Sequence, residues 1–185
     1  MKAPLTYFEG HLSYKEKLEK PEYRFEFAIK QLKNGYPLDV LDIGCGDGTF
    51  IGHLLKAGHR ADGVEIDKEK LAVAKKNTGQ VIFSSFNKVT KLYDAVVAIE
   101  VLEHLKGGPV VFLERMRKRL KPGGVIFFTV PIEIELLDAD HRHFFDIYDV
   151  IELANKFSED FTVWYIPKYL KFGAELKLFA VLIRC

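Results

Sequence analysis

The chain has 185 residues, of which 48% are apolar and 29% are charged, and this composition predicts one ordinary globular domain over residues 1–185. The net charge of +1 provides no global field that would recruit nucleic acid or an acidic membrane surface, which argues against a nucleic-acid substrate but leaves it open. No apolar run is long enough for an export signal or a membrane span, so we expect a cytoplasmic protein without membrane contact.

Two helices are predicted before the first strand. Ser13 and Glu16 have the spacing of a capping box, and Pro21 suits the first position of a second helix. This second helix carries aromatic and aliphatic side chains on one face and ends near Asn34. Residues 1–36 are therefore expected to be mainly helical.

A strand, a glycine turn and a helix are predicted next. The apolar run from Leu38 to Ile43 indicates a buried strand, glycines follow at positions 44, 46 and 48, and a helical pattern begins at Phe50. Glycine permits positive φ and a close approach of the backbone to a ligand, and the start of the helix presents free N–H groups. This turn is therefore expected to hold a ligand.

The spacing around the turn separates two classes of ligand. The third glycine comes one residue earlier than in the dinucleotide fingerprint G-x-G-x-x-G, and Asp42 stands two residues before the first. The stretch resembles motif I of the class I S-adenosylmethionine-dependent methyltransferases. The resemblance implies that Ile43, Gly44, Cys45 and Gly46 pass under the methionine part of the cofactor and that Asp42 contacts its amino end. A nicotinamide-dependent oxidoreductase on the same kind of sheet is the rival interpretation.

A second acidic residue follows the second predicted strand. Residues 59–66 indicate this strand, and Asp67 closes it as the N-cap of a helix. Glu65 lies about twenty residues after the glycine turn, where a carboxylate can accept hydrogen bonds from a ribose diol. The resemblance implies this role for Glu65 and implies that Ile66 packs on the adenine.

The residues that follow the third predicted strand, residues 80–83, differ from the family pattern. Many methyltransferases of this class have an aspartate there that accepts from the adenine amino group, whereas this chain has Ser84 and Ser85. The adenine contact is therefore expected from one of these hydroxyls, from the backbone or from stacking on Phe86.

The fourth predicted strand, residues 93–99, is apolar enough to be buried on both faces. If a helical turn follows it, Glu100, Glu103 and His104 stand at i, i+3 and i+4 on one side, at the edge where open α/β sheets bind ligands. The E-V-L-E-H run resembles motif IV of many small methyltransferases, which lines the pocket between cofactor and methyl acceptor. Glu100 is therefore a candidate pocket residue.

Three interpretations of this cluster stay open. His104, with Glu103 beside it, is a candidate general base for the group that receives the methyl. Alternatively, the cluster binds a divalent cation with a further ligand from residues 140–143. The resemblance suggests Mg²⁺, which the ubiquinone-pathway O-methyltransferases and small-RNA methyltransferases bind at the same run. In the third interpretation Glu103 and His104 only orient the loop.

The remaining chain completes the predicted sheet. Residues 121–131 resemble the L-K-P-G-G turn and fifth strand of the family, so the resemblance covers residues 38–131 in order. Residues 132–145 are expected to form an irregular loop on the substrate side, in which His141 and His143 are candidates for binding acceptor or metal. A capped helix and two strands, paired as an antiparallel hairpin, follow this loop.

Taken together, these elements predict the α/β class, with a single doubly wound, mostly parallel seven-stranded sheet and an antiparallel final strand. The resemblance implies that residues 1–36 cover the cofactor pocket. It also implies methyl transfer from S-adenosylmethionine to an oxygen or nitrogen of a small molecule. The retained alternatives are a metal-assisted O-methyltransferase acting on RNA or a quinone-like acceptor, and a non-catalytic cofactor-binding partner protein.

Overall fold

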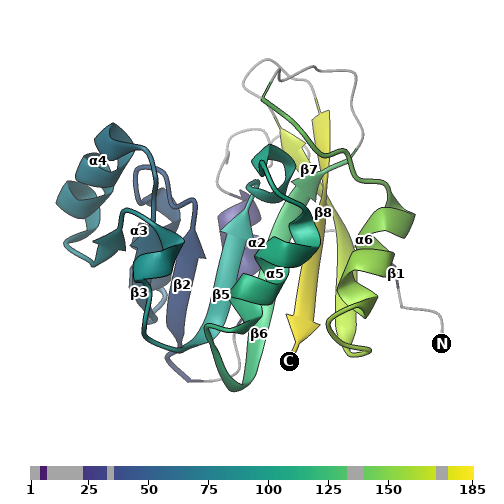
Figure 1. Ribbon diagram of the computed structural model, residues 1–185, viewed down its shortest axis with the longest axis horizontal. Coiled ribbons are helices and arrows are strands. Elements are labelled where there is room, and N and C mark those ends of the chain that lie inside the picture. Colours follow the sequence, from purple (N-terminus) through teal and green to yellow (C-terminus); the bar gives the residue numbers. More distant parts are fainter. Residues whose placement is uncertain (1–4, 8–22, 33–35, 133–139, 170–174) are drawn as a thin grey trace.

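A computed structural model describes residues 5–7, 23–32, 36–132, 140–169 and 175–185 (Figure 1). Within these residues eight strands form one sheet in the order β1-β7-β8-β6-β5-β2-β3-β4. The strands are β1 (Leu5–Tyr7), β2 (Asp39–Ile43), β3 (Arg60–Val64), β4 (Ile82–Phe83), β5 (Tyr93–Ile99), β6 (Leu120–Pro131), β7 (Phe161–Tyr169) and β8 (Glu175–Arg184). The helices are α2 (Tyr23–Leu32), α3 (Thr49–Lys56), α4 (Lys68–Thr78), α5 (Pro109–Arg117) and α6 (Ile147–Asn155), with short helical turns η1 (Phe86–Lys88) and η2 (Leu102–His104).

The strand directions confirm the predicted fold class. β2 pairs in parallel with both β3 and β5, and β5 pairs in parallel with β6. β8 lies between β6 and β7 and is antiparallel to both, as expected for the closing hairpin. The edge strand β1, which pairs in parallel with β7, is an addition to the predicted seven strands. The first predicted helix, residues 13–20, lies outside the described residues.

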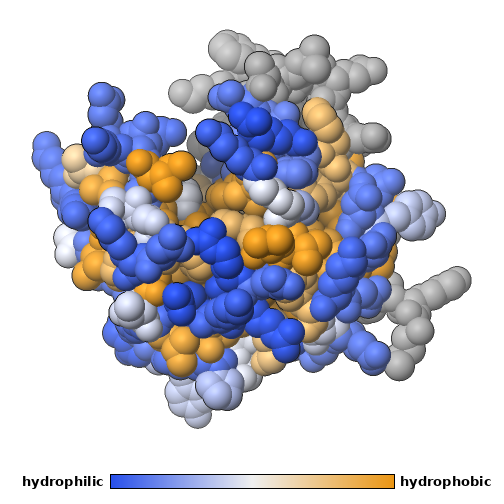
Figure 2. Space-filling view, in the orientation of Figure 1, coloured by the Kyte–Doolittle hydropathy of each residue, from blue (hydrophilic) through white to orange (hydrophobic). Residues whose placement is uncertain are grey.

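Two apolar layers hold the sheet between helices, because successive residues of a strand point to opposite faces. On β5, Val96 and Ala98 join the layer under α5 and α6, whereas Ala95 and Val97 join the layer under α2 and α3. Figure 2 views the face covered by α5 and α6, where apolar side chains are visible between hydrophilic ones. The middle of the sheet is therefore buried on both faces, and ligands have access at the strand ends.

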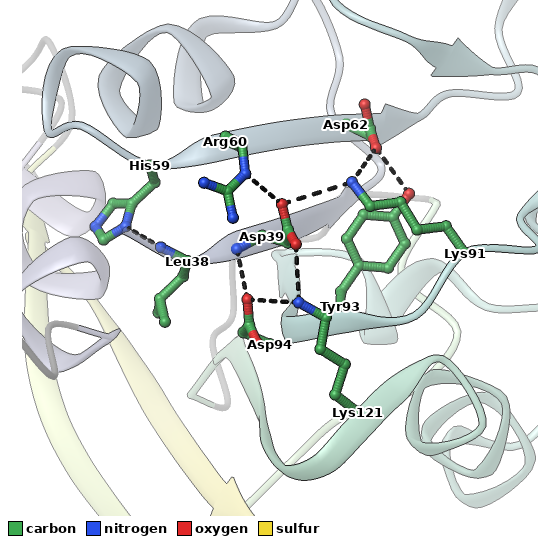
Figure 3. Close-up of polar contacts among 9 residues, drawn as sticks. All are labelled: Leu38, Asp39, His59, Arg60, Asp62, Lys91, Tyr93, Asp94 and Lys121. Atoms are coloured by element: carbon green, nitrogen blue, oxygen red, sulfur yellow. Dashed lines mark hydrogen bonds and ion pairs between the residues drawn. The ribbon is translucent and has the colours of Figure 1, made fainter. Parts of the chain in front are cut away.

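Ion pairs hold the amino ends of the central strands together (Figure 3). The Asp39 carboxylate accepts hydrogen bonds from Arg60 Nε at 2.7 Å and from Lys121 Nζ at 2.8 Å. Lys121 also donates to Asp94 at 3.0 Å, and Asp94 accepts the backbone N–H of Asp39 at 2.8 Å. The Arg60 guanidinium, followed by the Lys121 ammonium, holds the pKa of Asp39 well below its usual range. Strands β2, β3, β5 and β6 are thus linked at this edge through side chains.

Among the residues that the structure describes, no helix combines the length and the apolar character that crossing a bilayer requires.

Candidate functional site

The glycine turn joins the carboxyl end of β2 to α3. Gly44, Gly46 and Gly48 all have positive φ, of 74°, 56° and 84°. A Cβ on Gly44 would lie 2.7 Å from Cγ2 of Val101, so only glycine lets this turn pack against the segment that follows β5. The N–H groups of Gly44 and Cys45 donate to Val64 O at 2.8 and 3.1 Å, which fixes the turn to the end of β3.

Glu65 lies against the glycine turn. Its side chain is buried, and its Oε2 accepts the N–H of Gly46 at 2.9 Å while its Oε1 accepts the N–H of Asp67 at 2.8 Å. Asp67 caps α4, as predicted, by accepting from the N–H groups of Glu69 and Lys70. A carboxylate oxygen can accept a second hydrogen bond, so Glu65 can receive the two hydroxyls of a ribose without leaving the turn.

Asp42 is the second buried carboxylate of this edge, with a relative exposure of 3%. Burial, and then the negative charge of Glu65, raise the pKa of Asp42 to about 7. A cationic group beside Asp42 would therefore favour its ionised form. Two buried carboxylates at one edge fit S-adenosylmethionine, which brings an ammonium and a sulfonium and so supplies the positive charge that Asp42 and Glu65 favour.

The other predicted cofactor residues differ in how accessible they are. Ile43 and Cys45 are buried, whereas the side chain of Ile66 is 82% exposed and is free to pack on a flat ligand. Burial raises the pKa of the Cys45 thiol to about 12, and its Sγ occupies the space that a Cβ on Gly63 would need. Cys45 therefore packs the turn, as is usual for a small residue in such a loop, and is a poor nucleophile.

The two serines after β4 have local hydrogen bonds. Ser85 caps η1 by accepting the N–H of Asn87, and the Ser84 hydroxyl accepts from Lys88 Nζ at 2.8 Å. Phe86 is buried in the apolar layer, with Arg115 stacked 4.8 Å from its ring centroid. The stacking of adenine on Phe86, which was one of the expected contacts, is therefore not favoured. The two serine hydroxyls and the backbone are the remaining options.

Glu100 does not lie on the predicted helical turn. The helical turn η2 covers only Leu102–His104, and Glu100 has φ 55°, the one positive φ of a non-glycine residue in the described ranges. Its N–H donates to Oγ1 of Thr129 at 3.1 Å, and its carboxylate lies 3.3 Å from Arg24 Nε. The expected i, i+3, i+4 arrangement is wrong for Glu100 because the chain bends before the turn begins. Sequence reasoning missed Arg24 as its partner, since the two are far apart in the chain.

Glu103, His104 and His141 form the cluster at this edge. Their ligand atoms all lie within 4.8 Å of one another, and the two imidazole rings are 4.8 Å apart. Glu103 is buried, and its carbonyl accepts the N–H groups of Arg142 at 2.7 Å and His143 at 3.1 Å. These backbone bonds bring the end of the predicted substrate-side loop onto η2. Residues 133–139 of that loop lie outside the described residues.

The hydrogen bonds of the histidines distinguish their roles. His143 Nε2 lies 3.0 Å from Leu105 O and 3.1 Å from Gly107 O, and a carbonyl can only accept, so this nitrogen carries the proton. His104 Nδ1 lies 3.3 Å from Asp140 O, which leaves Nε2 as the basic nitrogen. His143 therefore fastens the loop, whereas the exposed His104 keeps a lone pair for a proton or a metal.

Comparisons with known proteins agree with this geometry. A family described as "Methyltransferase domain" matches residues 14–162. The ubiquinone biosynthesis O-methyltransferase of Colwellia psychrerythraea is 32% identical over 108 residues, which are 52% of this chain and 44% of the relative. The chain thus spans about half the length of the curated relatives that it matches.

Solved structures show the same fold. A SAM-dependent methyltransferase from Archaeoglobus fulgidus superposes with a TM-score of 0.74 at 16% identity, over 93% of this chain and 96% of that one. Magnesium protoporphyrin IX methyltransferase from Synechocystis, with bound S-adenosylhomocysteine, gives 0.69 at 13% identity, over 95% and 90%. With its fold, its glycine turn and the matched residues in agreement, this chain belongs to the methyltransferase-domain family, within the class I S-adenosylmethionine-dependent methyltransferases.

Proposed function

We propose that the protein transfers the methyl group of S-adenosylmethionine to a hydroxyl oxygen of a small molecule. The observation that carries this proposal is the contact between Val101 and the glycine turn. Val101 immediately precedes η2, so the turn that carries Glu103 and His104 begins against the loop proposed to hold the cofactor. The proposed sites for the methyl donor and the methyl acceptor thus lie at the same edge of the sheet.

On the cofactor side, Glu65 would bind the ribose hydroxyls, and Asp42 would face the ammonium group directly or through water. Backbone from Ile43 to Gly46 would pass under the methionine part, and exposed Ile66 would cover the adenine, with Ser84 or Ser85 near its edge. S-adenosylmethionine supplies a methyl group that is already activated by the sulfonium charge. The main contribution of the chain is therefore to position donor and acceptor in line.

On the acceptor side, His104 is proposed to take the hydroxyl proton at Nε2 as the methyl group is transferred. Glu103 would keep η2 and the loop ending at His143 in place. The curated relatives are named O-methyltransferases, which favours oxygen over nitrogen as the acceptor atom. A nearby groove of about 380 Å³, lined in part by Arg142, His143 and Phe145, has the size of a small-molecule site.

A metal-assisted reaction is the second candidate, favoured by the cluster of Glu103, His104 and His141. A cation bound at about 2.1 Å needs opposite ligand atoms roughly 4.2 Å apart, so small side-chain adjustments would suffice. Two imidazoles and one carboxylate suit Zn²⁺, Mn²⁺ or Fe²⁺ better than Mg²⁺, which prefers oxygen ligands. The ion would supply a Lewis acid for the acceptor oxygen. Calorimetric titration with Mn²⁺ and with Mg²⁺, without cofactor, distinguishes the two ions.

A binding titration followed by an acceptor screen tests the proposed function. S-adenosylhomocysteine is expected to bind the purified chain at one site, and Glu65→Gln is expected to weaken that binding about tenfold or more. Glu69→Gln is the matched control, because Glu69 is an exposed carboxylate in the first turn of α4. Binding of NAD in place of S-adenosylhomocysteine would contradict the proposal.

The acceptor screen distinguishes a small-molecule acceptor from an RNA acceptor and from a protein without catalytic activity. Methyl transfer to small hydroxyl compounds supports the proposal, and transfer to an RNA oligonucleotide alone supports the RNA alternative. Tight cofactor binding without turnover on any acceptor supports a non-catalytic partner protein.

A further inference from the structure

The exposure of side chains alternates along the segment that joins the histidine cluster to α6. Within residues 141–145, Arg142 and Phe144 are exposed, whereas the other three side chains are buried or half-buried. His141 lies against His104, with ring centroids 4.8 Å apart, and the N–H of Arg142 donates to the η2 carbonyl. The backbone is therefore fixed beside the proposed base, and it presents a cation and an aromatic ring to the outside.

Arg142 and Phe144 both line the groove of about 380 Å³. The groove lies between α5 and α6, which cover the same face of the sheet (Figure 1). Apolar side chains form part of its wall, among them Val110 of α5 and Leu153 of α6. The side chain of Phe144 is 60% exposed at this groove. A large aromatic side chain that stays in water beside an apolar groove is typical of a ligand contact.

Arg142 differs from the other charged residues of the groove. Lys156 Nζ lies 2.9 Å from Oε1 of Glu152, so these two charges form an ion pair. The Asp149 carboxylate accepts the N–H of Asp146 at 3.0 Å, within the capping box of α6. Arg142 forms no ion pair with any carboxylate of the described residues. Its guanidinium is thus available to a carboxylate, which it binds best through two parallel hydrogen bonds.

We propose that Arg142 and Phe144 select the methyl acceptor, and that this acceptor is a hydroxylated aromatic acid. Arg142 binds its carboxylate, and Phe144 packs on its ring. The inference rests on the proposed function and specifies the class of small molecule. A single guanidinium balances a single negative charge, which favours a carboxylate over a phosphate, which carries more charge. The anchor for the carboxylate is one residue from His141 and so from the proposed base, where the hydroxyl of the acceptor is needed.

The test compares two probes that differ in charge and hardly in shape, 4-hydroxycinnamate and its primary amide. Each is titrated by calorimetry into the chain saturated with S-adenosylhomocysteine. The unmodified chain is expected to bind the acid about tenfold more tightly than the amide. Arg142→Gln is expected to remove this preference, with the acid weakened about tenfold and the amide within about twofold. Arg117→Gln removes an exposed arginine of α5 outside the groove and is expected to keep the preference.

Two further measurements separate the ring contact from the charge. Phe144→Ala is expected to weaken the acid and the amide alike, by roughly three- to tenfold, because the ring contact does not depend on the carboxylate. An increase in salt concentration is expected to weaken the acid and leave the amide unchanged. Unchanged binding of both probes by Phe144→Ala would contradict the proposed ring contact.

The titration with S-adenosylhomocysteine comes first and separates this inference from the proposed function. If the unmodified chain does not bind S-adenosylhomocysteine, the proposed function itself is wrong. If it does, but binds the acid no more tightly than the amide or binds neither probe, the cofactor stands and this inference fails. A preference for the acid that survives Arg142→Gln would also overturn it. Equal weakening of both probes by Arg142→Gln would overturn it as well, because Arg142 would then act through the fold.

Discussion

The pKa of aspartate is shifted in opposite directions at the two edges of the sheet. Asp39 and Asp42 stand on the same five-residue strand, β2. At the amino edge Asp39 is surrounded by Arg60, Lys91 and Lys121, and its pKa lies well below the usual range. At the carboxyl edge Asp42 is buried near Glu65, and its pKa is raised to about 7. Cations within the fold balance Asp39, whereas burial and a like charge act on Asp42, and a bound cationic cofactor would offset both of these effects.

The largest expected effect concerns His104 at the carboxyl edge. His104→Asn removes the proposed base and should lower kcat roughly a hundredfold to ten-thousandfold, with the affinity for S-adenosylhomocysteine unchanged. His143→Asn is the matched variant, since His143 fastens the loop through Leu105 and Gly107, and it should lower stability more than kcat. Steady-state kinetics and denaturant unfolding measure the two effects. An equal loss of kcat in both variants would assign His104 a structural role.

The next effect concerns the glycine turn. Gly44→Ala combines positive φ with a Cβ 2.7 Å from Val101, and it should lower the free energy of unfolding by about 2–4 kcal/mol and abolish tight cofactor binding. Gly58→Ala is the control, because Gly58 also has positive φ but a Cβ there meets nothing within 4 Å. It should cost about 1 kcal/mol. Similar losses in both variants would mean that the Val101 contact is unimportant.

A smaller effect is expected at the amino edge. Asp39→Asn should lower the free energy of unfolding by about 1–2 kcal/mol at pH 7, because its partners are partly exposed and screened by salt. Its folded pKa lies below its ordinary value of 3.8, so this stabilisation is present above that value and is lost as the pH falls through the folded pKa. Urea unfolding from pH 2 to 7 measures it, and an unchanged acid transition in the variant would contradict the account.

Asp42 should show the opposite pH dependence. Because its folded pKa is raised from 3.8 to about 7, its ionisation weakens the folded state as the pH rises between these values. Asp42→Asn should therefore be more stable than the unmodified chain at pH 8, by at least about 1 kcal/mol. The same urea series measures this gain. A loss of stability at pH 8 would show that Asp42 is already balanced by a cation.

The smallest effect is expected at Cys45. Cys45→Ala removes a packed thiol beside Gly63 and should cost about 1 kcal/mol of stability while the transfer rate stays within about twofold. The pKa of about 12 also predicts slow labelling by a thiol reagent in the folded chain. Fast labelling of Cys45 under native conditions would contradict its packing role.

Local patterns were enough to predict most of the fold. The strand expected at residues 93–99 has those bounds in the structure, and Asp67 caps α4 as expected, since both follow from neighbouring residues. The edge strand β1 was missed because three residues carry little signal, and their pairing with β7 is a contact between distant segments. Its prediction would have required the tertiary structure.

The candidate site was predictable in its residues and less so in its geometry. The spacing of E-V-L-E-H suggested one helical face, but the contacts of Glu100 with Thr129 and Arg24 override the local preference. Glu103 therefore lies with His104 and His141, whereas Glu100 is held by residues that are distant in the sequence. The ion pairs of Asp39 with Arg60 and Lys121 were missed because these partners are also far from Asp39 in the sequence.

The most direct test of the difference between the edges is a calorimetric titration at pH 7 of Asp42→Asn and Asp39→Asn with S-adenosylhomocysteine. Asp42→Asn is expected to weaken binding about tenfold, because the ammonium loses its charged partner. Asp39→Asn is expected to bind within about twofold of the unmodified chain, because the amino edge is remote from the ligand. Equal affinities in the two variants, or a larger loss in Asp39→Asn, would contradict the claim that the carboxyl edge alone is built to receive the cofactor.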